Sequence, residues 1–247
     1  MASTTASPAI TTTTAMTTTT ITTDAALYRL LAWLSPAYPV GAYTYSHGLE
    51  TAVEDGLVAT RPALVEYIAT VLRHGAGRVD AALLVAAWRA AAAADDTALD
   101  EVARLAAAWR GTAETALESM AQGTAFTSVT EAAWPEPRFA AFAARHPRQL
   151  AHPVAFGAAA GFQALPLRPA LTGWLAGFAA NLVSAGVRLV PLGQTDGQIA
   201  TAALHAVVEA AAAAALDAEL EQIGTATPFL DLLSMRHESQ YTRLFRS

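Results

Sequence analysis

An uncharged stretch from Pro169 to Val187, flanked by Arg168 and Arg188, places the strongest constraint on the fold. It is nearly long enough to cross a bilayer, and Gly173 and Gly177 within it match the GxxxG pattern. Its polar and small residues dilute the apolar character, and the sequence contains no second candidate span. Because a helix that is apolar on every side is equally expected at the centre of a helical bundle, we predict a buried core helix and no membrane association.

Helical spacing dominates the remaining chain. Leu27, Leu30, Leu31 and Leu34 repeat at i, i+3, i+4 and i+7, which is the pattern of an amphipathic helix. The alternation of apolar and polar residues that is typical of strands occurs only in short, ambiguous runs. The sequence therefore predicts an all-α protein: a single helical-bundle domain of about ten helices over residues 24–224, with flexible N- and C-terminal tails.

The two tails differ in chemistry. Residues 1–23 are a low-complexity tract of Thr, Ala and Ser, which cannot bury enough apolar area to offset the entropy of ordering, so we predict disorder there. Residues 225–247 contain the helix-breaking Pro228, and from Ser234 onward they carry three arginines against one glutamate, in a chain whose net charge is -6. Arginine and aromatic residues are enriched at interfaces, so this segment is predicted to bind a partner.

Composition excludes several classes of function. The chain has no cysteine and no lysine, so disulfides, thiolate metal sites, a Walker A loop and a Schiff base are all impossible from this chain alone. The negative net charge argues against binding nucleic acid. The six histidines show no metal-ligand spacing, and no nucleophile motif is present. We therefore expect a protein that is not an enzyme, with no catalytic residue, no metal ligand and no cofactor.

Two loops interrupt the helical pattern. In residues 35–50, Pro36 and Pro39 fix the backbone, and Gly41 and Gly48 permit conformations that other residues resist. The same loop carries Tyr43, Tyr45, Ser46 and His47. Taken alone, it is best explained as a rigid turn packed into the core.

The second loop covers residues 191–198. Thr195 and Gln198 have capping-box spacing, which predicts a helix from Thr195 to about Leu220, and Gln194 and Asp196 remain free for other bonds. Taken alone, this loop reads as an ordinary helix start.

Residues 35–50, residues 188–198 and the tail from residue 234 to residue 247 together closely resemble the three signature segments of the UreF urease accessory proteins. The likeness runs from about Leu27 to the C-terminus. It implies an all-α, cytoplasmic chaperone for nickel insertion that forms a homodimer. It also implies binding to the UreD/UreH accessory protein, recruitment of the GTPase UreG, and action on the urease apoprotein.

The resemblance also implies roles for individual residues. In that family the C-terminal segment becomes ordered against UreD/UreH and helps to receive UreG. The implied partner-binding residues are Arg236, His237, Glu238, Tyr241, Arg243, Leu244, Phe245 and Arg246. The signature-loop residues are Pro36, Pro39, Gly41, Tyr43, Tyr45, Ser46, His47, Gly48, Gln194, Asp196 and Gln198.

Three functional hypotheses follow from the resemblance. The first, which we favour, is a scaffold that holds partners together, with nickel handled by the complex. The second is a regulator that acts in trans on UreG, supplying a tail arginine, Gln194 or Gln198 to GTP hydrolysis. The third is direct participation in nickel transfer through His47, His237 or nearby carboxylates. An unrelated small-molecule enzyme is the weakest alternative, because the sequence offers no constellation of residues for it.

Overall fold

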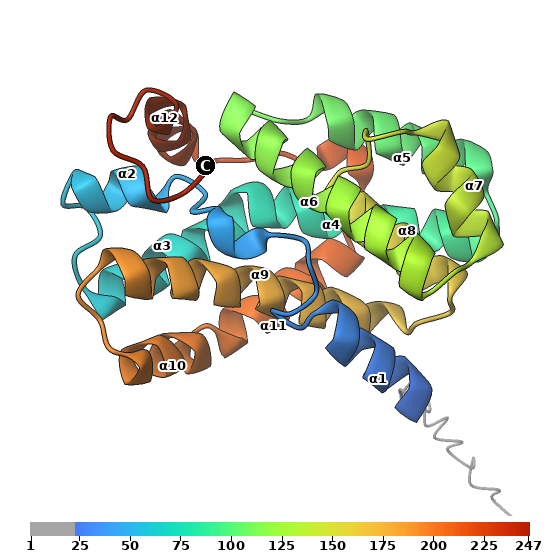
Figure 1. Ribbon diagram of the computed structural model, residues 1–247, viewed down its shortest axis with the longest axis horizontal. Helices are drawn as coiled ribbons and strands as arrows, with labels where there is room; N and C mark the ends of the chain where they lie inside the picture. The colour runs from blue at the N-terminus through green and yellow to red at the C-terminus, as the bar shows by residue number, and fades with distance from the viewer. Residues whose placement is uncertain (1–22) are drawn as a thin grey trace, which may run out of the picture.

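The computed structural model describes residues 23–247, and within that range all regular structure is helical (Figure 1). It contains twelve α-helices and two short 3-10 helices, so the predicted all-α fold is confirmed and the predicted count of about ten is close. The sequence predicts disorder for residues 1–23, and residues 1–22 of that range lie outside the described residues. Thr23 caps the first helix, and its hydroxyl accepts a hydrogen bond from the amide of Ala26 at 3.2 Å.

The helices are short to medium in length and are joined mostly by tight connections. In chain order they are α1 (Asp24–Trp33), η1 (Ala42–Thr44), α2 (Leu49–Glu54), α3 (Arg61–His74), α4 (Ala76–Ala93), α5 (Asp96–Ala108), α6 (Ala113–Ala133), α7 (Pro137–Arg145), α8 (His152–Phe162), α9 (Leu167–Leu189), α10 (Gln194–Ala203), α11 (His205–Leu216), η2 (Leu220–Gln222) and α12 (Pro228–His237).

The most intimate packing in the bundle joins α4 and α8. Every residue of α8 from Pro153 to Gly161 is buried. A Cβ atom at Gly157 would stand far inside contact distance of the Leu84 carbonyl oxygen, and one at Gly161 would lie 2.6 Å from the Trp88 carbonyl oxygen. The two helices therefore meet backbone to backbone, which is possible only because these positions lack side chains.

The uncharged stretch of the sequence forms α9, which packs against α3, α4, α10 and α11. Half of its most apolar window is buried inside the bundle. In the part of the chain that the structure describes, α9 is the one continuous helix with the length and hydropathy of a membrane span; α10 and α11 reach that standard only together and are bent by 41°. Gly173 and Gly177 do not face another helix, because the side chain of Leu34 lies against them.

Two local expectations are wrong. The helix after the second loop begins at Gln194, with Gly193 as its N-cap, and the carboxylate of Asp196 accepts from the Gly193 amide at 3.4 Å. Gly193 thus takes the N-cap position that the sequence suggested for Thr195, and Asp196 takes the role suggested for Gln198. The expected single helix to residue 220 is divided at Leu204, where α10 gives way to α11.

The C-terminal segment is not a flexible tail, in contrast to the sequence-based expectation. α12 packs on α2 and α6, and the chain after it folds back onto the bundle (Figure 1). Phe245 and Ser247 are 3% and 1% exposed. The expectation was wrong because the partners of this segment are buried carboxylates on distant helices, which the local sequence does not reveal.

Replacement of Gly157 by alanine tests the contact between α4 and α8. We expect Gly157→Ala to lower the free energy of unfolding by about 1–3 kcal/mol, because the new methyl group forces two backbones apart. The matched control is Gly177→Ala, whose Cβ would meet only a Leu34 methyl group at an ordinary 3.9 Å. This control should stabilise the protein by about 0.5–1 kcal/mol. Urea denaturation followed by circular dichroism measures both, and equal effects would contradict the close contact.

Candidate partner-binding surface

The first signature loop is shaped to receive the C-terminal segment. Gly41 and Gly48 both adopt left-handed conformations, with φ of 74° and 76°. A Cβ atom at Gly48 would lie 3.2 Å from the backbone nitrogen of Ser234 and 3.3 Å from the hydroxyl of Tyr67. Gly48 therefore permits the close approach of α12 as well as the turn into α2. The fold brings the first and third signature segments into direct contact.

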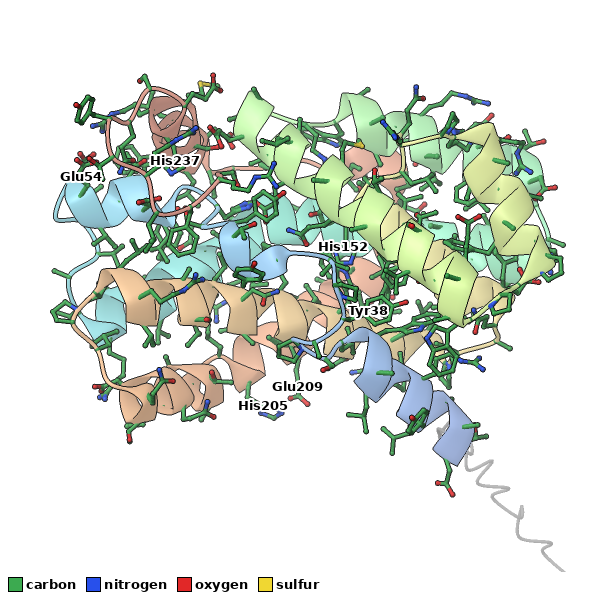
Figure 2. The ribbon with its side chains drawn as sticks, in the orientation of Figure 1. Tyr38, Glu54, His152, His205, Glu209 and His237 are labelled. Atoms are coloured by element: carbon green, nitrogen blue, oxygen red, sulfur yellow. The ribbon has the colours of Figure 1, made fainter. Side chains whose placement is uncertain are left out.

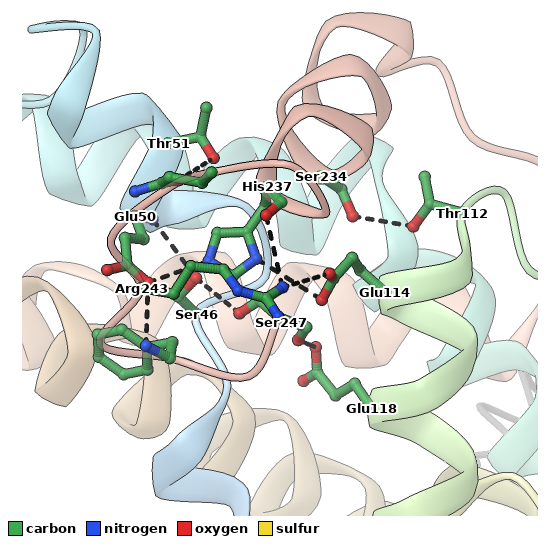
Figure 3. Close-up of polar contacts among 12 residues, drawn as sticks. Ser46, Glu50, Thr51, Thr112, Glu114, Glu118, Ser234, His237, Arg243 and Ser247 are labelled. Carbon is green, nitrogen blue, oxygen red and sulfur yellow. Dashed lines mark hydrogen bonds and ion pairs between the residues drawn. The ribbon is translucent and has the colours of Figure 1, made fainter.

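Glu50 of α2 is the main anchor of the C-terminal segment (Figure 3). One of its carboxylate oxygens accepts from the amide of Leu244 at 2.6 Å. The other accepts from the amide of Phe245 at 3.0 Å and lies 3.0 Å from Nε2 of His237. Both Glu50 and His237 are buried. Hydrogen bonds to a buried carboxylate are strong, and they compensate the cost of removing its charge from water.

Two further carboxylates come from one face of α6. Glu114 accepts from Nη1 of Arg243 at 2.9 Å, and its second oxygen lies 3.6 Å from Nδ1 of His237. Glu118, one turn later, accepts from the hydroxyl of Ser247 at 3.2 Å and lies 3.2 Å from Nδ1 of His47. His237 thus stands between carboxylates of α2 and α6, and both helices hold the C-terminal segment in place.

Backbone contacts complete this attachment. The main-chain oxygen of Ser247 accepts from both the amide and the hydroxyl of Ser46, at 2.6 and 2.7 Å. The amide of Arg246 donates to the carbonyl of Thr44 at 2.7 Å. The guanidinium of Arg188 lies 4.3 Å from the ring centre of Phe245, which is a cation–π arrangement. Residues 238–247, which we call the C-terminal strap, are therefore held against the bundle through residues 243–247.

Burial and charge act in opposite directions on the histidines near the strap. Burial favours the neutral ring of His47, but the neighbouring Glu118 carboxylate outweighs burial and raises the pKa of His47 above its ordinary value. Nearby His152 has no comparable partner, and burial lowers its pKa to about 4. At neutral pH, His152 is therefore an uncharged member of the core.

A second buried ion pair lies beneath the loop. Arg110 donates to Asp80 at 2.8 Å, and both side chains are less than one-tenth exposed. Burial raises the pKa of Asp80, and the Arg110 guanidinium opposes that rise. Truncating either partner would leave the other charge buried and uncompensated, which is costly.

The outer side of the C-terminal segment is apolar and open to solvent. On α12, Phe229, Leu232 and Met235 follow one another at three-residue spacing and are about half exposed. In the strap, Leu244 is 63% exposed and Tyr241 is fully exposed. We call these five residues the C-terminal surface. Exposed aromatic, leucine and methionine side chains of this kind are typical of protein interaction sites.

The structure divides the sequence-predicted tail residues into three groups. His237 and Phe245 are buried within the chain, and Glu238, Tyr241 and Leu244 face solvent. The three arginines contact groups of this chain: Arg236 forms a two-pronged ion pair with Asp55, Arg243 pairs with Glu114, and Arg246 lies over the ring of Tyr45.

The signature-loop residues are similarly divided. Pro36, Pro39 and Tyr43 are exposed, whereas Tyr45, Ser46 and Gly48 are buried and His47 is nearly so. In the second loop, Gln194 and Gln198 are exposed, and Asp196 lies 2.5 Å from Arg61 of α3. α10 lies at the edge of the bundle opposite α12 (Figure 1), so the second loop does not join the C-terminal surface.

The sequence analysis did not find Glu50, Glu114 and Glu118, the three carboxylates that hold the strap. Glu114, Glu118 and Gln122 recur at four-residue spacing on α6, so one face of this helix is polar along two turns. All three side chains are buried, and the amide of Gln122 donates to Glu118 at 3.2 Å. A buried polar stripe of this kind is visible in the sequence once the helix is recognised. Glu50 had no comparable signal.

The His, Asp and Glu side chains do not form a metal site in the described residues. Within residues 23–247, no three or more His, Asp or Glu side chains are arranged to ligate one metal ion. His47 and His237 each face carboxylates through ring nitrogens, and those carboxylates in turn bind the strap. The labelled side chains of Figure 2 show His205 and Glu209 together on α11, apart from His152 and His237.

Fold and surface together define an all-helical accessory-type protein, without strands in the described residues and with exposed apolar side chains on its C-terminal segment. Comparison with known proteins gives the family. The UreF family model matches residues 58–205. The chain is 66% identical over 226 residues to the urease accessory protein UreF of Granulibacter bethesdensis, covering 92% of this chain and 96% of the relative. It is 50% identical over 224 residues to that of Rhodopseudomonas palustris strain BisB5, covering 91% and 92%.

A third relative, the urease accessory protein UreF of Bradyrhizobium diazoefficiens, is 46% identical over 223 residues, covering 90% of this chain and 92% of the relative. The protein belongs to the UreF family. The resemblance on which the sequence analysis relied is therefore confirmed.

Replacement of Glu50 by glutamine tests the anchoring of the strap. In Glu50→Gln, the side-chain NH₂ group would face the backbone N–H groups of Leu244 and Phe245, which are also donors. We therefore expect docking of the strap to weaken by about 1.5–3 kcal/mol. Hydrogen exchange at the Leu244 and Phe245 amides should accelerate accordingly. The control is Glu54→Gln on the exposed side of the same helix, which should leave exchange unchanged. Unaltered protection in Glu50→Gln would contradict the assigned role.

A pH dependence follows from the pKa of His152. Because the folded-state pKa of about 4 lies below the ordinary value of 6.5, the unfolded chain binds the extra proton first as pH falls. Stability should therefore be full above pH 6.5 and decrease by about 3 kcal/mol toward pH 4 from this group. Urea unfolding of His152→Gln should show a flatter profile over this window. His205→Gln, at a 75% exposed histidine, should keep the wild-type slope.

Proposed function

We propose that this protein is a non-catalytic scaffold of urease maturation. In this proposal it joins the UreD/UreH accessory protein and the GTPase UreG into one complex that delivers nickel to apo-urease. Nickel is the cargo of the complex and needs no permanent site in this chain. The observation that carries the proposal is the C-terminal surface, an apolar patch held in a fixed conformation by a buried ionic network. Membership of the UreF family supports it.

The fixed conformation and the side chains of the C-terminal surface suit binding to a protein partner. Preorganised contact residues lose little entropy on binding, and aromatic and leucine side chains surrounded by arginines are well suited to interface cores and rims. Tyr241 and Leu244 project from a strap whose Leu244 and Phe245 amides donate to Glu50 of the same chain. We place UreD/UreH on this surface, with UreG recruited by the assembled pair. We further propose that the protein acts as a homodimer in the cytoplasm.

The alternative in which this chain regulates GTP hydrolysis has less support. An arginine finger must be free to reach the nucleotide of its partner. Arg236 and Arg243 are instead paired with Asp55 and Glu114 of the same chain. Gln194 and Gln198 are exposed, but they lie on α10, away from the C-terminal surface. The scaffold therefore fits the geometry better than a catalytic contribution in trans.

A double substitution in the strap tests the proposal. Tyr241→Ala with Leu244→Ala removes two outward side chains that make no docking contact through their side chains, so the fold should persist. We expect capture of UreD/UreH in a pull-down to fall at least tenfold, as for loss of interface anchors. Ile199→Ala, at an exposed residue of α10, should bind normally.

The full deletion of residues 238–247 extends this test. It should abolish capture while α-helical content is retained. Wild-type capture by the deletion variant would falsify the placement of the partner on the C-terminal surface.

A further inference from the structure

A cavity of 450 Å³ lies between α3, α4, α11 and η2, and the scaffold function makes no use of it. Its volume falls within the range of about 300–1,000 Å³ that is usual for small-molecule sites. The end of α3, the start of α4 and η2 supply part of the lining. The remaining wall consists of alanines in and just after α11, namely Ala210, Ala211, Ala214, Ala215 and Ala218.

Contacts within the chain hold the walls of this cavity in place. The amide of Ala226 donates to the carbonyl of His74 at 2.8 Å, which ties the segment after η2 to the end of α3. Nη2 of Arg89 on α4 donates to the carbonyl of Leu216 at 2.7 Å, which ties α4 to the end of α11. Because the walls are already fixed, binding of a ligand would require little reorganisation.

The charged side chains of the lining favour an anion. Arg73 and Arg78 line the cavity, and both side chains are exposed, so a ligand can reach them. Neither arginine forms an ion pair within residues 23–247. Glu219 is the acidic residue of the lining, so two arginines against one glutamate give a formal charge of +1, without counting His74. A ligand with a single negative charge would balance this lining, and guanidinium groups match the geometry of a carboxylate.

The apolar part of the lining favours a hydrocarbon chain. The methyl groups of the alanine wall are joined by the side chains of Leu72 and Ile223. No Phe, Tyr or Trp of the described residues lines the cavity, so an aromatic ligand would have no ring to stack on. A saturated chain gains from burial in proportion to the apolar area that it removes from water.

We propose that this cavity binds an aliphatic monocarboxylate. The carboxylate pairs with Arg73 and Arg78, and the hydrocarbon chain lies along the alanine wall. The protein then carries a small-molecule site on α3, α4 and α11, separate from the C-terminal surface.

Three probes test the proposal on the full chain by isothermal titration calorimetry at neutral pH and low salt. Octanoate and octanamide share one chain and have heads of similar shape, but only octanoate is charged. We expect octanoate to bind at millimolar concentration or below, and about fivefold or more tightly than octanamide. Acetate, which lacks the chain, should bind more weakly than octanoate by at least about tenfold. Absence of octanoate binding at millimolar concentration, or an affinity no greater than that of either other probe, would overturn the proposal.

Substitution of the arginines locates the carboxylate. Arg73→Gln and Arg78→Gln remove the charge at exposed positions, so the fold should persist. At least one of them should weaken octanoate by about three- to tenfold and leave octanamide unchanged. Arg104→Gln is the control, since Arg104 is an exposed arginine of α5 that does not line the cavity. Unchanged octanoate affinity in both variants, or an equal loss in the control, would overturn the proposal.

A cavity-filling variant locates the chain. Ala214 is an exposed residue of α11 that lines the cavity, whereas Ala206 is an exposed residue of the same helix that does not. Ala214→Phe should abolish octanoate binding, and Ala206→Phe should leave it unchanged, while circular dichroism and the thermal midpoint show an intact fold in both. Undiminished binding in folded Ala214→Phe would overturn the proposal, as would an equal loss in Ala206→Phe.

Discussion

The position of α12 and of the C-terminal strap depends on the hydrogen bonds made by the buried carboxylate of Glu50. It receives two consecutive backbone amides of the strap and the ring of His237, all within 3.0 Å. A carboxylate without these donors would be costly in this position, and amides without the carboxylate would be left unpaired. α2, α12 and the strap are therefore energetically coupled, and the outward residues hold their positions because the inward ones are satisfied.

The same logic extends into α6 through Glu114 and Glu118. Three carboxylates from two helices face Arg243, His47 and His237, so a polar centre lies within the bundle, next to its large apolar core. Such centres often cost stability relative to apolar packing, but they require one specific geometry. The apolar contact of α4 with α8 holds the bundle together, while the ionic centre determines where the last ten residues lie.

The local chemistry of the sequence was enough for the helical class, for most helix positions and for the identification of the loops and the tail as special. Pro36, Pro39, Gly41 and Gly48 indicated a built turn, and the composition after Ser234 indicated an interface. The local chemistry could not predict which residues far apart in the sequence contact one another. That Glu50 meets Leu244, or Glu118 meets Ser247, depends on long-range packing of helices, and no residue pattern near Glu50 announces it. The capping role of Asp196 in place of Gln198 depended on where the first turn of α10 begins.

The strap is attached through its backbone and through its inward side chains, while Tyr241 and Leu244 take no part in that attachment through their side chains. Under the proposed scaffold function, positioning and recognition are assigned to different atoms of the same ten residues. Outward positions are free to change in size and polarity without loosening the strap. The surface on which the proposed partner would bind can therefore be altered one side chain at a time, while Glu50, Glu114 and Glu118 keep the strap in the same place.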